Sequence, residues 1–365
     1  MKAAITSAVG ERFEIREGIT LDEPGPDEVV VQVRASGLCH SDISVAEDSV
    51  GFPMPAVLGH EVSGDVIAIG AGVRDFNLGD RVVACCIATC GHCESCRVGR
   101  PYQCKNPAEM ERGPSDAPRI RLDGEVPLFQ FMGVGGFAEQ VLIHKNQLVK
   151  IPAEIPYDIA CLLGCGVVTG AGAALNTANV QPGETVAVIG CGGVGLNVIQ
   201  GAALAGAKKV IAVDLSPEKL AIAKQFGATH VVNAADVDPI AAVQDLTSGG
   251  VTSSFEVIGL EQTAVQALRM CAVGGTAYLI GVQKPGTVLD FQLFEDLILP
   301  QKAFRGVSMG SSVPRVDIPM YAELYLQGKF MLDELVSQKI HLEEINEAYD
   351  LLKQGGIARS VITAF

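Results

Sequence analysis

The spacing of hydrophobic residues changes along the chain and predicts where its strands and helices lie. Val186–Ile189 is a short apolar run rich in β-branched residues, which is typical of a strand buried on both faces. Val194–Ala205 follows with the pattern of a helix, and Val210–Val213 is a second apolar strand. Strand and helix patterns then alternate to about residue 308. This alternation predicts an α/β fold with a parallel sheet.

The rest of the chain carries a different pattern. Residues 1–85 are strand-rich, whereas residues 105–130 are polar and proline-rich, so we expect an exposed loop or lid there. The strand pattern returns from Phe131. The tail, Pro319–Phe365, carries helices and a last strand, Ser360–Ala364. These parts predict a second domain around the α/β region.

A glycine-rich turn joins the first apolar strand to its helix. Gly190, Gly192 and Gly195 occupy the three positions of GxGxxG, where glycine permits a tight turn, the approach of a pyrophosphate and close helix–strand packing. The helix N-terminus after this turn would face the anion. Asp214 ends the next strand about 20 residues on, where a carboxylate can accept both hydroxyls of an adenosine ribose. A carboxylate repels a 2′-phosphate, which favours NAD over NADP. A βαβ unit that binds nothing is the alternative, and the strand, helix and acid together disfavour it.

Cysteine and histidine residues form two candidate metal sites. Cys39 and His60 offer a thiolate and an imidazole from the same small domain, as a zinc site needs. A second group has the spacing of a closed tetrahedral zinc site, and consists of Cys90, Cys93, Cys96 and Cys104. An iron–sulfur cluster is a rival for these four thiolates, but the last gap is long and no proline follows. A disulfide knot is less favoured in a reducing compartment.

Composition narrows the function further. The 365 residues, 48% hydrophobic and 19% charged, indicate a globular chain of about two domains. The net charge of −15 argues against nucleic acid or an anionic membrane as a partner. No secretory signal pattern and no apolar run of about 18 residues is present, so we expect a soluble, cytoplasmic protein. Its eleven cysteines are then expected as metal ligands and core residues.

Specific motifs follow one another over nearly the whole chain: GLCHSD, GHE, the four-cysteine lobe, GCGVVTGAGAALN, the glycine-rich turn and ARSVITAF. In this order they resemble the zinc-dependent medium-chain alcohol dehydrogenases. The resemblance implies a Rossmann nucleotide-binding domain inserted in a GroES-like, mainly-β catalytic domain. Residues 1–166 and 309–365 would form the catalytic domain, with the structural zinc lobe at about 88–106. Residues 167–308 would bind NAD.

The resemblance implies two Zn²⁺ ions per chain. Cys39, His60 and Cys165 would ligate the catalytic zinc, with water or alcohol in the fourth position, and the lobe would hold the structural zinc. Glu61 resembles the family's nearby carboxylate, which can approach the metal during ligand exchange. Asp42 resembles the acid that orients the ligand histidine.

The implied reaction is hydride transfer between an alcohol and NAD. Zinc stabilises the alkoxide, which gives a hydride to the nicotinamide, and the aldehyde or ketone leaves. Ser41 is similar to the family's proton-relay hydroxyl; a serine that only bonds local backbone is the alternative. Ser44 stands where many members have the histidine that ends the relay, so water is a candidate for the final base.

The resemblance also assigns cofactor contacts. Thr169 and Val194 would back the nicotinamide, Lys219 would contact the adenosine ribose and Arg359 the pyrophosphate. Lys219 could equally be a solvated charge on a helix face. His40 stands where a pyrophosphate-binding arginine is common, and a neutral imidazole there would hold the cofactor less tightly. The remaining expected contacts are Gly193 and Val282.

Substrate residues are implied in the same way. Cys86 replaces an aromatic residue that commonly lines the pocket, which suggests room for a bulky or aromatic primary alcohol. Phe131 and Met132 resemble further pocket walls. The alternative within the family is a thiol-dependent formaldehyde dehydrogenase, which uses an arginine shortly after the last lobe cysteine. Here that region reads Lys105-Asn106-Pro107, which disfavours a glutathione adduct but leaves another thiol carrier open.

Two function classes outside this family are also possible. A metal-free quinone reductase would lack the cysteine lobe, and a non-catalytic zinc protein would have no use for a nucleotide-binding fold. The family is commonly a homodimer or homotetramer through edge strands of the cofactor domain, which would place the interface near residues 280–305.

Overall fold

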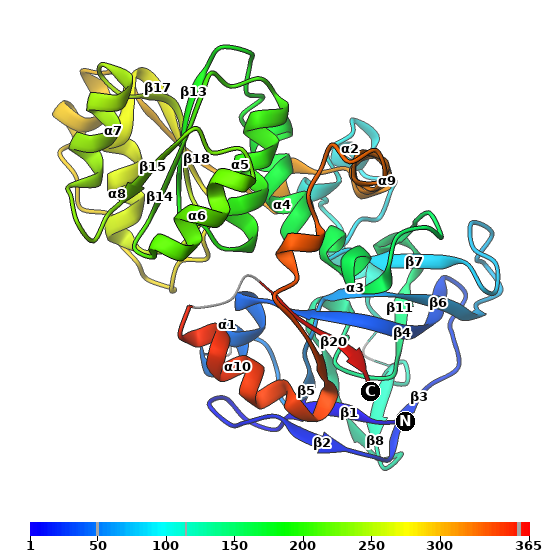
Figure 1. The fold of residues 1–365 in the computed structure, drawn as a ribbon. Helices are drawn as coiled ribbons and strands as arrows, with labels where there is room; N and C mark the ends of the chain where they lie inside the picture. Colours follow the sequence, from blue (N-terminus) through cyan, green and yellow to red (C-terminus); the bar gives the residue numbers. More distant parts are fainter. Residues whose placement is uncertain (49–50, 114, 356–358) are drawn as a thin grey trace. The chain divides into compact units, whose positions relative to one another are not determined.

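The computed structural model describes residues 1–48, 51–113, 115–355 and 359–365, which form two compact units (Figure 1). Unit 1 comprises Met1–Cys165 and Val313–Phe365, and unit 2 is Gly166–Ser312. The predicted domain limits, after residues 166 and 308, lie one residue past the first boundary and four residues before the second. The second boundary comes later because the Ser312 hydroxyl donates a 3.0 Å hydrogen bond to the carbonyl of Val168, which holds this segment on unit 2.

Unit 2 is built on a six-stranded parallel sheet with the strand order β15-β14-β13-β16-β17-β18. Counted along the chain this order is 3-2-1-4-5-6, the doubly wound arrangement, so the predicted α/β fold is confirmed. All residues of β13 are buried, as its unbroken apolar sequence requires. The strand order reverses between β13 and β16, and such sheets bind ligands at the carboxyl ends of the strands beside that point.

The strands of this sheet are β13 (Thr185–Ile189), β14 (Lys209–Asp214), β15 (His230–Asn233), β16 (Val251–Glu256), β17 (Cys271–Leu279) and β18 (Ala303–Gly306). The helices of unit 2 are α4 (Gly166–Gly172), η6 (Ala173–Thr177), α5 (Gly193–Leu204), α6 (Pro217–Gln225), α7 (Pro239–Thr247), α8 (Glu261–Met270), η7 (Leu293–Ile298) and η8 (Met309–Ser311). Apolar side chains of α7 and α8 pack on the sheet in one buried core.

Unit 1 is mainly β-structure, and its largest sheet is centred on the long strand β4. This strand pairs with β6, β11 and β20, and the sheet runs in the order β12-β7-β6-β4-β20-β19. Two smaller sheets have the orders β10-β5-β1-β2 and β3-β8-β9. The last strand, β20, spans the predicted range and lies antiparallel to β4, so the end of the chain closes the sheet.

The strands of unit 1 are β1 (Ala3–Thr6), β2 (Glu14–Arg16), β3 (Ile19–Leu21), β4 (Glu28–Leu38), β5 (Ala56–Val57), β6 (Glu61–Ile69), β7 (Arg81–Ala84), β8 (Ile120–Leu122), β9 (Val126–Pro127), β10 (Phe129–Gln130), β11 (Gln140–His144), β12 (Leu148–Lys150), β19 (Gln338–His341) and β20 (Ser360–Ala364). Its helices are α1 (His40–Asp48), α2 (Glu94–Arg97), η1 (Pro101–Gln103), η2 (Pro107–Met110), η3 (Phe131–Gly133), η4 (Lys145–Gln147), α3 (Tyr157–Ala160), η5 (Cys161–Gly164), α9 (Pro314–Leu326), η9 (Asp333–Leu335), η10 (Leu342–Glu344) and α10 (Ile345–Lys353).

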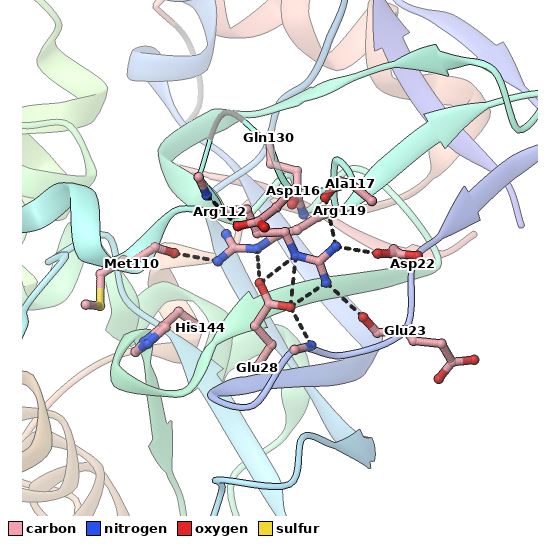
Figure 2. Close-up of polar contacts among 12 residues, drawn as sticks. Asp22, Glu23, Glu28, Met110, Arg112, Asp116, Ala117, Arg119, Gln130 and His144 are labelled. Atoms are coloured by element: carbon pink, nitrogen blue, oxygen red, sulfur yellow. Dashed lines mark hydrogen bonds and ion pairs between the residues drawn. The ribbon is translucent and has the colours of Figure 1, made fainter.

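The segment expected as an exposed loop or lid is instead anchored to unit 1. Its strand β8 pairs with β3, and two of its arginines bind the carboxylate of Glu28, the first residue of β4 (Figure 2). Nε of Arg119 lies 2.6 Å from Oε1 of Glu28, and Nη2 of Arg112 lies 2.6 Å from Oε2. Burial alone would raise the pKa of Glu28, but the two guanidinium groups lower it to about 2. Charge pairing therefore holds this polar segment in place, together with Ile120 and Leu128, which are buried in the apolar core of unit 1.

The prediction of a strand that begins at Phe131 is also wrong. Residues Phe131–Gly133 form the short helix η3, and the next strand, β11, begins only at Gln140. Gly133 and Gly135 have φ values of +72° and +65°, which are incompatible with extended backbone.

Among the described residues no single helix has both the length and the hydrophobicity to cross a membrane. One bent pair, Tyr157–Gly164 with Gly166–Thr177, passes by combined length and composition only.

Candidate metal centres and cofactor site

The carboxyl end of β4 brings distant parts of unit 1 to one point. In the sheet, Gly37 lies opposite Glu61 of β6, and Leu38 lies opposite Ser360 of β20. Cys39, which follows β4, therefore lies beside both His60–Glu61 and Arg359. Cys165 joins them because it follows η5, whose Gly164 packs so tightly on the carbonyl of Ala84 that an added Cβ would overlap it.

Four side chains converge there as a potential metal site. One donor atom from each of Cys39, His60, Glu61 and Cys165 lies within 4.8 Å of the others, and all four residues are buried. Nε2 of His60 has no hydrogen-bond partner in the part of the chain that the structure describes. A buried, unpartnered ring nitrogen beside two thiols is costly unless a cation occupies the space between them. Two sulfurs and one nitrogen are the donors that zinc prefers, so these residues fit zinc.

Asp42 holds the histidine of this site in one orientation. Its Oδ1 lies 3.0 Å from Nδ1 of His60 and also accepts a 3.0 Å hydrogen bond from the amide of Gly59, while Oδ2 accepts one of 3.0 Å from the amide of Cys39. Burial opposes a charge on the imidazole, but the Asp42 carboxylate and the nearby Cys86 and Cys39 sulfurs together outweigh it and raise the pKa of His60 well above its usual value. With Nδ1 engaged by Asp42, Nε2 is the nitrogen left for a metal.

Charge in the site is balanced by a buried arginine. Nε of Arg359 lies 3.1 Å from Oε2 of Glu61, and Nη2 lies 3.6 Å from Sγ of Cys39. Burial raises the pKa of Glu61, although the neighbouring Arg359 charge opposes that rise. The pKa of Cys39 is well below its usual value, mainly because the Cys165 thiol donates to it and also because Arg359 is near. Arg359, expected at the pyrophosphate, therefore contacts the metal-site residues in this structure.

The proposed relay residues lie at the edge of this donor set, at the start of α1. Oγ of Ser41 lies 3.9 Å from Sγ of Cys39, and Ser41 is half-buried. His40 is exposed. The hydroxyl of Ser44 donates a 3.1 Å hydrogen bond to the carbonyl of His40, so this serine bonds the helix backbone.

The four cysteines of the lobe converge around α2 and η1. Sγ of Cys96 lies 3.9 Å from Sγ of Cys90 and 3.4 Å from Sγ of Cys93. A tetrahedral zinc with Zn–S bonds of about 2.3 Å separates its sulfurs by about 3.8 Å, so these distances fit one ion. They are too short for sulfurs that enclose a cluster of several iron atoms. Backbone amides also donate to the sulfurs, including those of Cys90 and Asn106 to Cys104 at 3.3 and 3.4 Å.

The glycine-rich turn has the expected shape. Gly190 has a φ of +99°, and a Cβ on Gly195 would overlap the carbonyl oxygen of Gly190. A Cβ on Gly192 would meet no atom of the described residues within 4 Å, so this side of the turn is open to them. Asp214 ties the turn to β14, because its Oδ2 accepts a 2.7 Å hydrogen bond from the amide of Cys191. Its Oδ1 accepts hydrogen bonds from two amides that follow it.

The other expected cofactor residues all lie in unit 2, apart from His40 and Arg359. Thr169 lies on α4, where the neighbouring Gly170 packs against the carbonyl of Val194 in the first turn of α5. Gly193 begins α5. Lys219 is in α6 and is half-buried. Burial raises the pKa of the Cys191 thiol in the glycine-rich turn, and the Lys219 charge offsets part of that rise. Val282 lies beyond the carboxyl end of β17, with 64% of its surface exposed.

Comparisons with known proteins agree with both units. Residues 25–153 match the family described as alcohol dehydrogenase GroES-like domain, and residues 193–326 match zinc-binding dehydrogenase. A relative from Escherichia coli, S-(hydroxymethyl)glutathione dehydrogenase, is 37% identical over 99% of both chains. The chain belongs to the zinc-dependent medium-chain alcohol dehydrogenases. It is accordingly an oxidoreductase that acts on CH–OH groups with NAD and zinc.

Solved structures of this dehydrogenase family show the same fold. An alcohol dehydrogenase zinc-binding domain protein from Burkholderia ambifaria is 36% identical, with a TM-score of 0.94 over 100% of this chain and 98% of the other. Benzyl alcohol dehydrogenase from Acinetobacter calcoaceticus is 34% identical, with a TM-score of 0.93 over 100% and 99%.

The structure also places the expected pocket residues of this dehydrogenase. Phe131 is only 1% exposed and packs edge-on against the ring of His60, with centroids 5.3 Å apart. Met132 is half-buried, with a φ of +53°. Sγ of Cys86 lies 3.8 Å from the carbonyl of His60. Sequence reasoning missed the aromatic group behind the histidine: Phe52 packs edge-on against Phe131 at 5.0 Å. Its only sequence signal is an aromatic residue in the proline-rich stretch before GHE.

Proposed function

We propose that this dehydrogenase interconverts a bulky or aromatic primary alcohol and its aldehyde. The observation that carries the proposal is the buried donor set Cys39, His60 and Cys165, with the unpartnered Nε2 of His60 at its centre. Zinc bound there supplies a Lewis acid that lowers the pKa of an alcohol hydroxyl. Asp42 keeps the imidazole aligned, and Arg359 offsets part of the negative charge of the thiolates and Glu61.

The proton is proposed to leave through Ser41. Its hydroxyl is half-buried at the edge of the donor set, so it can accept a proton from the substrate and donate its own outward. Ser44 does not titrate near neutral pH and already bonds the carbonyl of His40, so solvent water is proposed as the final acceptor.

The cofactor contacts are proposed as the family implies. Asp214 has lone pairs beyond those given to its three amide donors and would take the ribose hydroxyls, with Lys219 nearby. Thr169 and Val194 would support the nicotinamide. Arg359 would contact the pyrophosphate while it stays paired with Glu61.

Substrate choice is the finer part of the proposal. A small Cys86 side chain leaves space that an aromatic residue would fill, and the benzyl alcohol dehydrogenase structure is similar over the whole chain. The relatives named S-(hydroxymethyl)glutathione dehydrogenase favour a second candidate, a thiol adduct of formaldehyde. Three cations that follow the last lobe cysteine in the chain are already paired with carboxylates, however. Lys105 lies 2.6 Å from Glu94, and Arg112 and Arg119 share Glu28.

One assay separates the two candidates. NADH formation is followed with benzyl alcohol, ethanol and formaldehyde, the last with and without glutathione or another thiol. The proposal expects the highest kcat/KM for benzyl alcohol and no stimulation by thiols. Strong thiol dependence with formaldehyde would replace it by the second candidate.

We also propose that the protein is a homodimer or homotetramer. β18 lies at the end of its sheet and pairs only with β17 among the described strands. Large apolar side chains are exposed nearby, at Val288, Leu293, Phe294, Ile298 and Leu299. A second copy that adds its own edge strand would cover both features. Light scattering on protein that elutes from a size-exclusion column gives its mass; a monomer at micromolar concentration would exclude the proposed oligomer.

The state of the cysteines bears on the cellular location. Eleven cysteines without a disulfide support a reducing compartment, so we propose a cytoplasmic location.

A further inference from the structure

A third thiol lies beside the catalytic donor set. Cys86 follows β7, and Cys165 follows η5; these two elements touch where Gly164 packs on the carbonyl of Ala84. This contact brings both cysteines to His60: Sγ of Cys86 lies 3.8 Å from the carbonyl of His60, and Sγ of Cys165 lies within 4.8 Å of a ring nitrogen of the same residue. Cys86 is half-buried, whereas Cys165 is buried, with only 8% of its surface exposed.

Cys86 is placed differently from a fourth metal ligand. It is not among the four residues whose donor atoms converge within 4.8 Å. Its sulfur instead contacts the backbone of His60, whose carbonyl lies 3.8 Å away. The thiol is therefore a neighbour of one metal ligand and is more accessible than that ligand.

We propose that Cys86 and Cys165 form a reversible disulfide under hydrogen peroxide and so switch the catalytic metal site off. The Cys86 sulfur, the more accessible of the two, attacks one peroxide oxygen, the O–O bond breaks, and a sulfenic acid and water result. The Cys165 sulfur then attacks the Cys86 sulfur, the S–O bond breaks, and a second water leaves. Two electrons pass from the two thiols to one peroxide. The disulfide withdraws one of the two thiolate donors from the site, and a thiol reductant restores it.

The test uses the zinc-loaded protein. Hydrogen peroxide is added in steps, the reaction is stopped with an alkylating reagent, and unreduced peptides are analysed by mass spectrometry while released zinc is measured with a chromogenic chelator. We expect a peptide pair linked through Cys86 and Cys165, loss of one of the two zinc ions, and recovery of both after dithiothreitol and added zinc. Linkage confined to the cysteines of the lobe would overturn the proposal, as would direct conversion of Cys86 to sulfinic acid.

Cysteine variants make the assignment specific. Cys86→Ser and Cys86→Ala should show no such linkage and release zinc several-fold more slowly, each measured against its own zinc content before treatment. Cys85→Ser is the matched control, because Cys85 is the preceding residue but is fully buried, and it should behave like the unaltered protein. Equal zinc release from the Cys86 variants and the unaltered protein would show that this thiol has no such role. The dehydrogenase activity of untreated protein tests the proposed function separately.

Discussion

Arg359 and Glu61 form a buried ion pair directly beside Cys39. Nε of Arg359 lies 3.1 Å from Oε2 of Glu61, and the two side chains are 4% and 0% exposed. Neither charge is tolerable alone at this depth, because the cost of removing a charge from water is offset only by its partner. The pair therefore belongs to the framework of the metal site as well as to any cofactor contact of Arg359.

Arg359→Gln should destabilise unit 1 by about 3–5 kcal/mol, since it leaves the Glu61 carboxylate buried without a counter-charge. The double variant Glu61→Gln/Arg359→Gln should recover part of this loss. The chain has no tryptophan, so urea unfolding is followed by circular dichroism. Arg315→Gln is the control, because its pair with Asp75 is exposed and should contribute at most about 1 kcal/mol. If Arg359→Gln and Arg315→Gln lowered the free energy of unfolding equally, burial would not be the reason for the importance of the Arg359–Glu61 pair.

The Glu28 carboxylate should make stability depend on acid pH. Its pKa is lowered from 4.5 to about 2 in the folded protein, so its contribution is complete above pH 4.5 and is lost as the pH falls towards 2. A shift of this size corresponds to about 3 kcal/mol. Glu28→Gln should lose that amount at pH 7, and the difference from the unaltered protein should shrink between pH 4.5 and 3. Glu94→Gln removes an exposed partner of Lys105 and should change little at either pH.

Metal analysis tests the catalytic donor set. Cys39→Ser should lower the zinc content from two ions per chain to one and abolish turnover, while NADH binding, measured by calorimetry, stays close to normal. Cys161→Ser is the matched control, because Cys161 is an equally buried thiol of unit 1 outside both donor groups. Retention of two zinc ions by Cys39→Ser would remove the basis for the site.

The Asp214 carboxylate should determine whether the enzyme prefers NAD or NADP. Asp214→Ala should weaken NAD binding by roughly tenfold or more, since hydrogen bonds to a charged group contribute about 1.5–3 kcal/mol, and should improve NADP binding. Asp214→Asn keeps an acceptor for the amide of Cys191 and should lose less NAD affinity. Calorimetric titration with both cofactors measures each change. An unchanged NAD-to-NADP ratio in the alanine variant would exclude the ribose role.

The sequence predicts features that depend on local spacing. The glycine-rich turn, the lobe and the last strand all follow from residues close together in the chain, and the structure has them there. Cys165 needed the family resemblance, because spacing alone does not distinguish it from Cys161. The anchoring of Arg112 and Arg119 to Glu28 was not predictable: the partners are 84 and 91 residues apart, so polar residues 105–130 resemble an exposed loop. Glu61 and Arg359 are 298 residues apart, and their pairing depends on the register of β20 on β4. It could not be predicted from the sequence either.

Two glycines of the turn should respond differently to the same added methyl group. Gly195→Ala forces a Cβ into the carbonyl oxygen of Gly190, so α5 has to move away from β13 and stability should fall. The added methyl group of Gly192→Ala meets no atom within 4 Å in the part of the chain that the structure describes, and Gly192 has a φ of −80°, so the fold should tolerate it. If this open side receives the pyrophosphate, Gly192→Ala should nevertheless bind NADH much more weakly. Thermal unfolding and NADH titration of both variants separate the two effects. Normal NADH affinity in Gly192→Ala would show that the pyrophosphate lies elsewhere.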